Sequence, residues 1–205
     1  SRRLPGAQSA LLAARASAIG GCAGTSYALA SEVYDLNIMG TLSTGFSAAY
    51  PSDQAALQAF SLHFPGVGYI SLPGDSFVDG VAQIAPYKEV IRIVRVDHWD
   101  LDMASRVVRE ELDKHGMERV KILGSGAMTE KKIMDLREKQ APIDLFAVGR
   151  QLAVGDSTTE ISLSYLLAEM WRGTEPEMIT RPGASAYPGL KQVLRTTEAD
   201  VICLD

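Results

Sequence analysis

The sequence predicts an α/β fold in which parallel strands are covered by helices. Five short apolar runs rich in β-branched residues recur before residue 150, and amphipathic stretches separate them. The runs begin 23 to 31 residues apart, a spacing typical of strand–helix–strand units. Because the runs are almost continuously apolar, we expect strands buried on both faces, as in an α/β barrel or an open doubly wound sheet.

The expected elements alternate along the chain. The predicted strands are 36–42, 67–72, 90–96, 120–123 and 143–148. The predicted helices are 7–19, 26–34, 52–63, 101–115 and 130–140. Thr129 is suited to cap the last helix, and Gly116 is suited to end the one before it. Residues 161–171 are compatible with either a strand or a helix, and the Pro- and Gly-rich tail predicts one short strand at 201–204.

Composition and charge exclude several classes of function. The 205 residues are 46% hydrophobic and 22% charged, which is ordinary globular composition, and the net charge is −5. This negative net charge argues against a basic surface that would bind nucleic acid or anionic lipid. No apolar stretch approaches the ~20 residues that a membrane helix needs. Cys22 and Cys203 lie far apart and match no metal spacing, so we expect two reduced thiols in a cytoplasmic protein.

Polar residues follow the strand predicted at 90–96. Ligands of parallel α/β folds bind at the carboxyl ends of the strands, so side chains at this point are candidates for a site. Asp97 and Asp100 are suited to bind a Mg²⁺–diphosphate or sugar hydroxyls. Asp100 is equally suited to cap the helix that follows. We interpret His98 and Trp99, which lie between them, as packing residues, and His63 and His115 as surface residues.

Two glycine-containing turns follow the next two strands. Gly124, Ser125 and Gly126 lead into a helix, and the free N–H groups of such a turn, with the helix dipole, can hold a phosphate. The alternative is a tight turn with no ligand. Gly149 and Arg150 follow the neighbouring strand, where a guanidinium beside a glycine turn suits a phosphate.

The first residues of the chain add two further anion-binding candidates. Arg2 and Arg3 form a cationic pair before a helix, and residues 20–26 form another Gly-rich turn. The alternatives are a solvated chain end and backbone packing. There is no G-x-G-x-x-G after the first strand and no P-loop, which argues against dinucleotide and NTPase sites. Together the features predict a phosphosugar substrate.

Seven segments in order resemble one enzyme family across almost the whole chain. They are the Arg2–Arg3 pair, IGGCAGTS at 19–26, IMGTL at 38–42, VRVDHWDL at 94–101, KILGSGAMTEKKI at 121–133, APIDLFAVGRQL at 141–152 and RPGASAYPGLKQVLR at 181–195. In these segments the chain resembles nicotinate phosphoribosyltransferase, within the type II phosphoribosyltransferases. The resemblance implies an irregular parallel α/β barrel over residues 1–205, with an N-terminal part of the family chain missing, and a dimeric or other homo-oligomeric assembly in the cytoplasm.

The resemblance also implies a reaction. Nicotinate displaces pyrophosphate from 5-phosphoribosyl-1-pyrophosphate (PRPP) to give nicotinate mononucleotide for NAD synthesis, with Mg²⁺ assisting and ATP hydrolysis coupled to the transfer. Carried over residue by residue, Arg2 and Arg3 would contact phosphate or the nicotinate carboxylate, and Asp97 would serve the ribose or the metal. Ser125 and Gly126 would hold the 5-phosphate. The residues that would line the site are Gly24, Thr25, Gly40 and Thr41.

The sequence departs from the family at several positions of this rim. Thr44 stands where the family has the histidine that is phosphorylated when ATP is used. His98 and Trp99 replace a Ser-Gly pair, and Arg150 replaces a threonine. Two hypotheses therefore stay open: an active phosphoribosyltransferase for nicotinate or a related pyridine acid, and a catalytically silent homologue that serves as a binding or assembly subunit.

Overall fold

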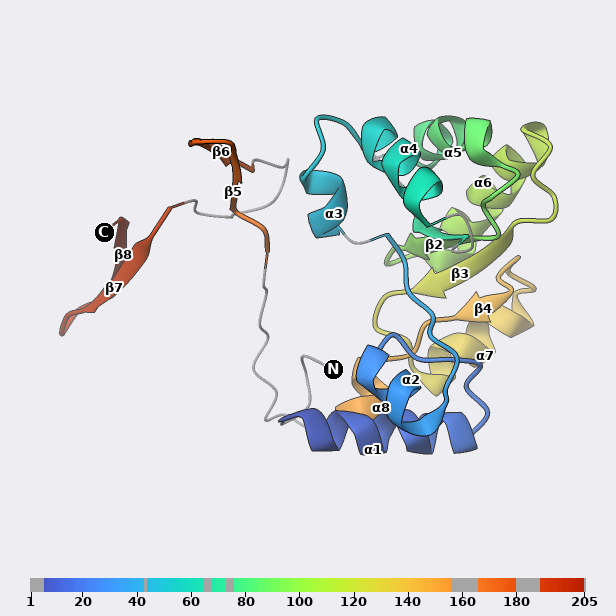
Figure 1. Ribbon diagram of the computed structural model, residues 1–205. Helices are drawn as coiled ribbons and strands as arrows, with labels where there is room; N and C mark the ends of the chain where they lie inside the picture. The colour runs from blue at the N-terminus through green and yellow to red at the C-terminus, as the bar shows by residue number, and fades with distance from the viewer. Residues whose placement is uncertain are drawn as a thin grey trace.

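Four parallel strands form the main sheet, in the order in which they occur along the chain (Figure 1). They are β1 (Tyr69–Ser71), β2 (Ile93–Asp97), β3 (Lys121–Ser125) and β4 (Leu145–Phe146). The computed structural model describes residues 6–42, 44–64, 68–72, 76–155, 166–179 and 189–204. The prediction of a parallel α/β fold is confirmed, and four of the five predicted strands coincide with β1 to β4.

The prediction of a strand at 36–42 is wrong. This segment makes one isolated parallel bridge, between Thr25 and Ile38, and the backbone N–H of Leu42 donates to the Tyr69 carbonyl oxygen of β1 at 3.4 Å. Its apolar residues suggested a buried strand, but Ile38 is 56% exposed. The segment instead runs as extended chain from the N-terminal helices to the edge of the sheet (Figure 1).

The strand order distinguishes the two sheet topologies that the sequence left open. Neighbouring strands in the sheet are neighbours in sequence, and the order does not reverse anywhere in the described residues. A doubly wound sheet requires such a reversal, whereas the strands of an α/β barrel follow one another around the barrel. The described strands form an open sheet and do not close on themselves.

Helices connect the strands and bury one side of the sheet. They are α5 (Phe77–Ile84) with the short 3-10 helix η1 (Ala85–Tyr87), α6 (Leu101–Lys114) and α7 (Glu130–Glu138), and α4 (Asp53–His63) precedes β1. Each of the four α-helices begins at a side-chain cap, provided by Ser52, Ser76, Asp100 or Thr129, which satisfies a backbone N–H that lacks a helical partner. In the part of the chain that the structure describes, none of the helices is long and apolar enough to span a bilayer.

The hydrophobic core lies between the sheet and these helices. Fully buried side chains come from β2 and β3, from α5 and from the inner face of α6, where the apolar residues recur at helical spacing. The most deeply buried large side chains are Ile70, Val81, Ile84, Val94, Val96, Leu101, Val108, Leu112 and Ile122. This core fixes β2 and β3 side by side over five residue pairs.

Replacing Leu112 with alanine is expected to lower the free energy of unfolding by about 3 kcal/mol, because the side chain is 0% exposed and its removal leaves a cavity. Leu62 is 74% exposed at the end of α4, so Leu62→Ala serves as the control and should change stability by less than about 0.5 kcal/mol. Urea unfolding followed by circular dichroism measures both. Equal effects of the two substitutions would contradict this packing.

The N-terminal helices form a separate layer below the sheet. Helices α1 (Gly6–Ile19) and α2 (Ala28–Tyr34) pack together, and α1 also contacts α8 (Arg150–Val154), which follows β4 (Figure 1). The short helix α3 (Thr44–Ala48) lies between this layer and α4. Helices α1 and α2 confirm the two helices predicted before residue 35, whereas α3, α5 and α8 were not predicted.

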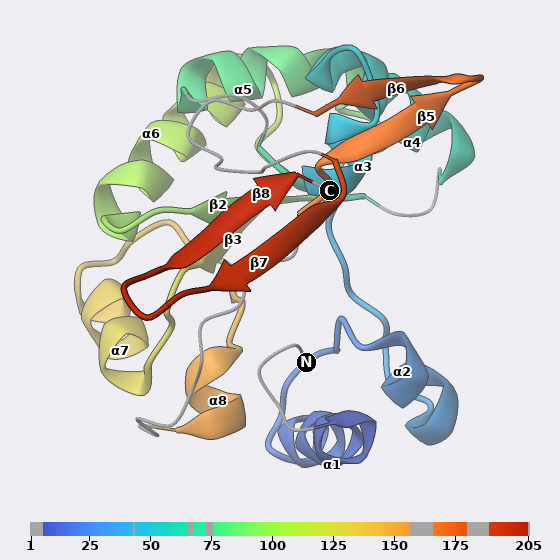
Figure 2. The ribbon, with the colours of Figure 1, turned by 90° about the vertical axis from the view of Figure 1, so that its left-hand side faces the viewer.

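Two antiparallel hairpins follow the α/β layer. The first pairs β5 (Glu169–Arg172) with β6 (Glu175–Met178), and the second pairs β7 (Lys191–Arg195) with β8 (Asp200–Leu204) (Figure 2). Strand β8 confirms the strand predicted at 201–204. The segment 161–171 was compatible with a strand or a helix, and β5 shows that its end is a strand. The guanidinium of Arg172 pairs with Glu177 across the first hairpin and donates to the Ala49 carbonyl oxygen at 2.6 Å, which ties that hairpin to the end of α3.

Candidate functional site

The carboxyl ends of β2 and β3 bring the central candidate residues together. Asp97 is the last residue of β2, Ser125 is the last residue of β3, and the two are paired in the parallel register. Asp97 is exposed at the rim, whereas Ser125 is 2% exposed. The sequence-based prediction that these two strand ends face one rim is therefore confirmed, although their roles stay predictions.

Arg95 connects these two residues. Its Nε donates to the Ser125 Oγ at 2.8 Å, and its terminal nitrogen forms an ion pair with the Asp97 carboxylate at 2.7 Å. Arg95 and Asp97 lie two residues apart in β2 and so share a face of the strand. The Arg95 side chain is 37% exposed, so solvent screens the pair and it contributes less than about 1 kcal/mol to stability. Its effect is to fix the orientation of both partners.

The contact with Arg95 also determines what Ser125 can do. A serine hydroxyl has one donor hydrogen and two acceptor lone pairs. Arg95 occupies an acceptor position of Ser125 Oγ, because a guanidinium can only donate. The hydroxyl hydrogen therefore remains for an acceptor such as a phosphate oxygen. Arg95 thus prepares Ser125 as a donor at the strand end.

Gly126 forms the turn that follows β3. Its φ of +107° is in the left-handed region that favours glycine, and a Cβ at this position would lie 2.9 Å from the Asp97 Oδ1. Ala127, the next residue, also has a positive φ of +44°. Backbone N–H groups of turns that lack an internal partner can bind anions. Only a glycine lets the turn approach Asp97 this closely.

The residues after Asp97 have structural partners of their own. The Asp100 carboxylate accepts a hydrogen bond from the Met103 N–H at 3.1 Å and caps α6, which is the alternative that the sequence left open for this residue. The His98 ring packs edge-on against Phe77 with centroids 5.5 Å apart, as expected of a packing residue. The Trp99 ring contacts the His98 ring, with centroids 5.4 Å apart, but Trp99 is 82% exposed, so it does not pack in the core.

Replacing Asp100 with alanine is expected to lower the free energy of unfolding by about 1 kcal/mol, because α6 loses its capping acceptor. Asp100→Asn keeps a side-chain oxygen at the same place and should retain most of that stability. Thermal unfolding of the two variants tests the capping role. If Asp100→Asn is as unstable as Asp100→Ala, the carboxylate charge has a role beyond the cap.

Two of the segments that resemble the family meet at the isolated bridge between Thr25 and Ile38. The Thr25 N–H donates to the Asn37 carbonyl oxygen at 2.9 Å, and the Met39 N–H donates to the Thr25 carbonyl oxygen at 2.8 Å. A Cβ on Gly24 would lie 2.7 Å from that same Asn37 oxygen, so close backbone approach explains this glycine. This contact supports the packing alternative for the Gly-rich turn at 20–26.

Thr41 reaches the rim through β1. The hydroxyl of Ser71, the last residue of β1, donates to Thr41 Oγ1 at 3.4 Å, and Ser71 is paired with Arg95 in the sheet. A continuous row therefore runs from Thr41 through Ser71 and Arg95 to the strand end at Ser125. Gly40 lies next to this row, and a Cβ there would meet no atom within 4 Å.

The remaining candidates lie partly outside the described residues. Arg2 and Arg3 lie outside them, as do the side chains of Thr44, at the start of α3, and Arg150, at the start of α8. Gly149 is the N-cap residue of α8 and lies three residues after the end of β4. Gly124 is a residue of β3 rather than of the turn, and a Cβ there would lie 3.2 Å from a methyl group of Ile143, so packing explains this glycine.

The carboxylates at the rim are few. Among the described residues, no three His, Cys, Asp or Glu side chains group as a metal site. Mg²⁺ nevertheless needs only one or two protein carboxylates when substrate phosphates and water complete its octahedron. Asp97 is exposed enough to be such a ligand. The residues present therefore fit a Mg²⁺ ion that a diphosphate carries, and they do not form a closed protein site.

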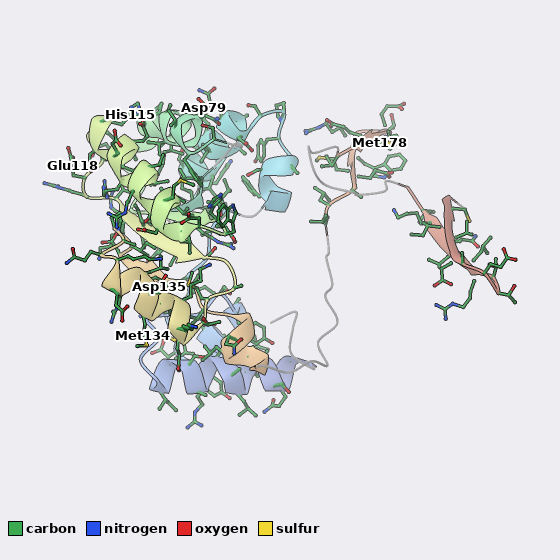
Figure 3. The ribbon with its side chains drawn as sticks, turned by 180° about the vertical axis from the view of Figure 1, so that it is seen from behind. Asp79, His115, Glu118, Met134, Asp135 and Met178 are labelled. Atoms are coloured by element: carbon green, nitrogen blue, oxygen red, sulfur yellow. The ribbon has the colours of Figure 1, made fainter. Side chains whose placement is uncertain are left out.

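Three residues of the rim were missed by the sequence-based prediction. They are Ser71, Arg95 and Lys132, whose Nζ donates to the Gly126 carbonyl oxygen at 3.0 Å. The alternation of β2 could have identified Arg95, since it lies two residues before Asp97. No sequence pattern indicates Lys132, because its side chain extends from the beginning of α7 back to the turn at Gly126. His63 and His115 are exposed as expected, and Figure 3 shows His115 on the surface.

Comparison with known proteins identifies relatives over the whole chain. Nicotinate phosphoribosyltransferase pncB2 of Mycobacterium tuberculosis is 35% identical over 209 aligned residues, which cover 100% of this chain and 45% of the relative. Nicotinate phosphoribosyltransferase of Bacillus subtilis is 26% identical over 99% of this chain and 45% of its own length. No protein-family model matches the chain. The chain spans about half the length of these curated relatives.

Solved structures share the fold at lower sequence identity. Nicotinate phosphoribosyltransferase from Vibrio cholerae superposes with a TM-score of 0.60 at 18% identity, over 73% of this chain and 38% of that chain. Nicotinate-nucleotide pyrophosphorylase from Pyrococcus furiosus gives a TM-score of 0.55 at 24% identity, over 91% of this chain and 47% of that chain. The fold is thus shared with both enzymes, and the chain is similar in sequence to nicotinate phosphoribosyltransferases over its whole length.

Proposed function

We propose that the protein transfers phosphoribose from PRPP to nicotinate, or to a related pyridine acid, for NAD synthesis. The observation that carries this proposal is the 35% identity to a Mycobacterium tuberculosis nicotinate phosphoribosyltransferase over the entire chain. The rim of Arg95, Asp97, Ser125 and Gly126 supports it, because it combines an exposed carboxylate with a hydroxyl donor and a glycine turn. These are the groups that a phosphosugar substrate requires.

The reaction exchanges one bond at C1 of the ribose for another. The bond between C1 and the diphosphate oxygen breaks, the diphosphate leaves with the bonding electrons, and the ring nitrogen of the acceptor forms the new bond to C1. Positive charge develops on the ribose as the diphosphate leaves. A fixed negative group near that charge lowers the barrier, because it stabilises the transition state more than the substrate.

The described residues have distinct roles in this proposal. The Asp97 carboxylate lies at the ribose, where it accepts hydrogen bonds from the sugar hydroxyls and faces the developing positive charge. Arg95 holds Asp97 in place and leaves the Ser125 hydroxyl hydrogen for the 5-phosphate. The turn at Gly126 supplies backbone N–H groups to the same phosphate. Thr41 borders the rim, and Gly149, Arg150, Arg2 and Arg3 are proposed as further anion contacts.

Mg²⁺ is proposed to reach the site with the diphosphate, where Asp97 would be its protein ligand and its charge would assist departure of the leaving group. Thr44 has no imidazole to accept a phosphoryl group in the manner of a histidine. We therefore propose that any ATP coupling does not proceed through residue 44. The four-stranded sheet is proposed to be an arc of an α/β barrel, in a cytoplasmic protein that assembles from identical subunits.

Pyrophosphate release from PRPP by the full-length protein tests the proposal. Nicotinate, nicotinamide and quinolinate are offered separately, each with and without ATP, and the mononucleotide is identified by chromatography. Release with one pyridine acid would establish both the reaction and the acceptor. Absence of release with every acceptor, while PRPP still raises the melting temperature, would overturn the enzymatic proposal in favour of a catalytically silent binding subunit.

A further inference from the structure

Lys132 lies in contact with the turn proposed to hold the 5-phosphate, although it belongs to the next helix. Its ammonium group donates a hydrogen bond to the Gly126 carbonyl oxygen at 3.0 Å, and its side chain is half-buried. The adjacent Lys131 is exposed on the same helix. The two neighbouring lysines therefore have different surroundings.

The turn that Lys132 contacts has an uncommon backbone. Gly126 and Ala127 both have positive φ values, +107° and +44°. A left-handed conformation is unfavourable for alanine, so surrounding contacts must hold it. The hydrogen bond from Lys132 to the Gly126 carbonyl is such a contact, and it joins α7 directly to the turn.

Holding this carbonyl also fixes the neighbouring N–H group. The peptide bond between Gly126 and Ala127 is trans, so the Gly126 C=O and the Ala127 N–H lie in one plane and point in opposite directions. While Lys132 holds the carbonyl oxygen on the α7 side, the Ala127 N–H points away from Lys132. Without the ammonium group, this peptide plane is free to rotate.

We propose that Lys132 is a positioning residue for phosphate binding, which orients the Ala127 N–H toward the 5-phosphate of the substrate by holding the Gly126 carbonyl. This inference rests on the proposed function for the identity of the phosphate. Lys132 acts through the turn, and its positive charge, next to the turn, adds to the attraction for the anion. The residue therefore affects affinity for the phosphate rather than the chemical step.

The test compares lysine variants of the full-length protein. Titration calorimetry with ribose 5-phosphate and with PRPP measures the dissociation constants, and steady-state kinetics gives KM for PRPP and kcat. Lys132→Met is expected to weaken ribose 5-phosphate binding about tenfold, which corresponds to loss of one hydrogen bond from the Ala127 N–H to the charged phosphate. KM for PRPP should rise by a similar factor with kcat changed less than about twofold, because binding in the ground and transition states is lost equally.

Matched variants separate positioning from a merely structural role. Lys131→Met removes the neighbouring charge and should leave the dissociation constants unchanged. Lys132→Arg keeps a donor and a positive charge and should recover most of the affinity. If Lys132→Met does not fold, Lys132→Gln, which keeps an N–H donor, replaces it and should show an intermediate loss of affinity.

Two results would overturn the inference: unchanged ribose 5-phosphate binding in the Lys132→Met or Lys132→Gln protein, or an equal loss in Lys131→Met. The inference and the proposed function can fail separately. Lysine-dependent ribose 5-phosphate binding without turnover supports the inference and contradicts the enzyme. Turnover with phosphate binding that does not depend on Lys132 supports the enzyme and contradicts the inference.

Discussion

Replacing Asp97 with asparagine is expected to lower kcat/KM for PRPP-dependent pyrophosphate release by a factor of about 100 to 1,000. The substitution keeps the size of the side chain and removes the negative charge that faces the ribose. It also breaks the ion pair with Arg95. Because both partners of that pair are more than one-third exposed, the free energy of unfolding should change by less than about 1 kcal/mol. A pyrophosphate assay and thermal unfolding of the same preparations measure the two effects.

Asp79 provides the control for this substitution. It is exposed in the first turn of α5, and Figure 3 shows it on the helical side of the molecule. Asp79→Asn removes the same charge from the protein and should leave kcat/KM within about twofold of the original value. An Asp97→Asn protein that turns over normally would remove Asp97 from the proposed mechanism.

Replacing Gly126 with alanine is expected to reduce both stability and activity. The left-handed backbone costs an alanine about 1 to 3 kcal/mol, which lowers the melting temperature of a chain of this size by about 2 to 10 °C. The new Cβ would also lie 2.9 Å from Asp97 Oδ1. The carboxylate must then shift from its present position, so activity should fall by at least about tenfold even at temperatures where the variant is folded.

The control for the stability effect is Gly40→Ala. A Cβ at Gly40 would meet no atom within 4 Å, so this substitution should leave the melting temperature nearly unchanged. Calorimetric unfolding of the two variants gives the comparison, and the pyrophosphate assay is run at 10 °C below the lower melting temperature. Full activity of Gly126→Ala would show that the position of the Asp97 carboxylate does not control the reaction.

The sheet and its covering helices could be predicted because their signals are local. Continuous β-branched runs predicted β2 and β3. The apolar spacing from Leu101 to Leu112 predicted α6 with nearly correct bounds. The strand predicted at 36–42 failed because an extended segment needs a hydrogen-bonded neighbour along its whole length to become a strand. Here the described segment has one isolated bridge, at Ile38, and one backbone hydrogen bond to β1, from Leu42. That pairing is a tertiary property, so the composition of the segment could not reveal it.

The candidate site was predicted from the ends of strands rather than from contacts. Asp97 and Ser125 follow from the rule that ligands bind at the carboxyl ends of parallel strands. Arg95 and Lys132 depend on which side chains reach across from a neighbouring strand or helix, and this is set by the register of β2 with β3 and by the path of the turn at Gly126. The capping role of Asp100, by contrast, could be predicted from the sequence, because a cap is a local contact with the first turn of the helix that follows.

The order of the strands also bears on how the chain acquires its structure during synthesis. Each strand of the main sheet pairs with the strand synthesised just before it. In the described sheet, no strand is therefore inserted later between two strands that are already in place. As the chain leaves the ribosome, β1, α5 and β2 can come together while β3 is still being made, and domains do begin to fold N-terminal part first. The growing sheet then adds strands at a single open edge, and each new helix covers the strands behind it. A doubly wound sheet, by contrast, adds strands at both edges, so some strands pair with a strand made much earlier.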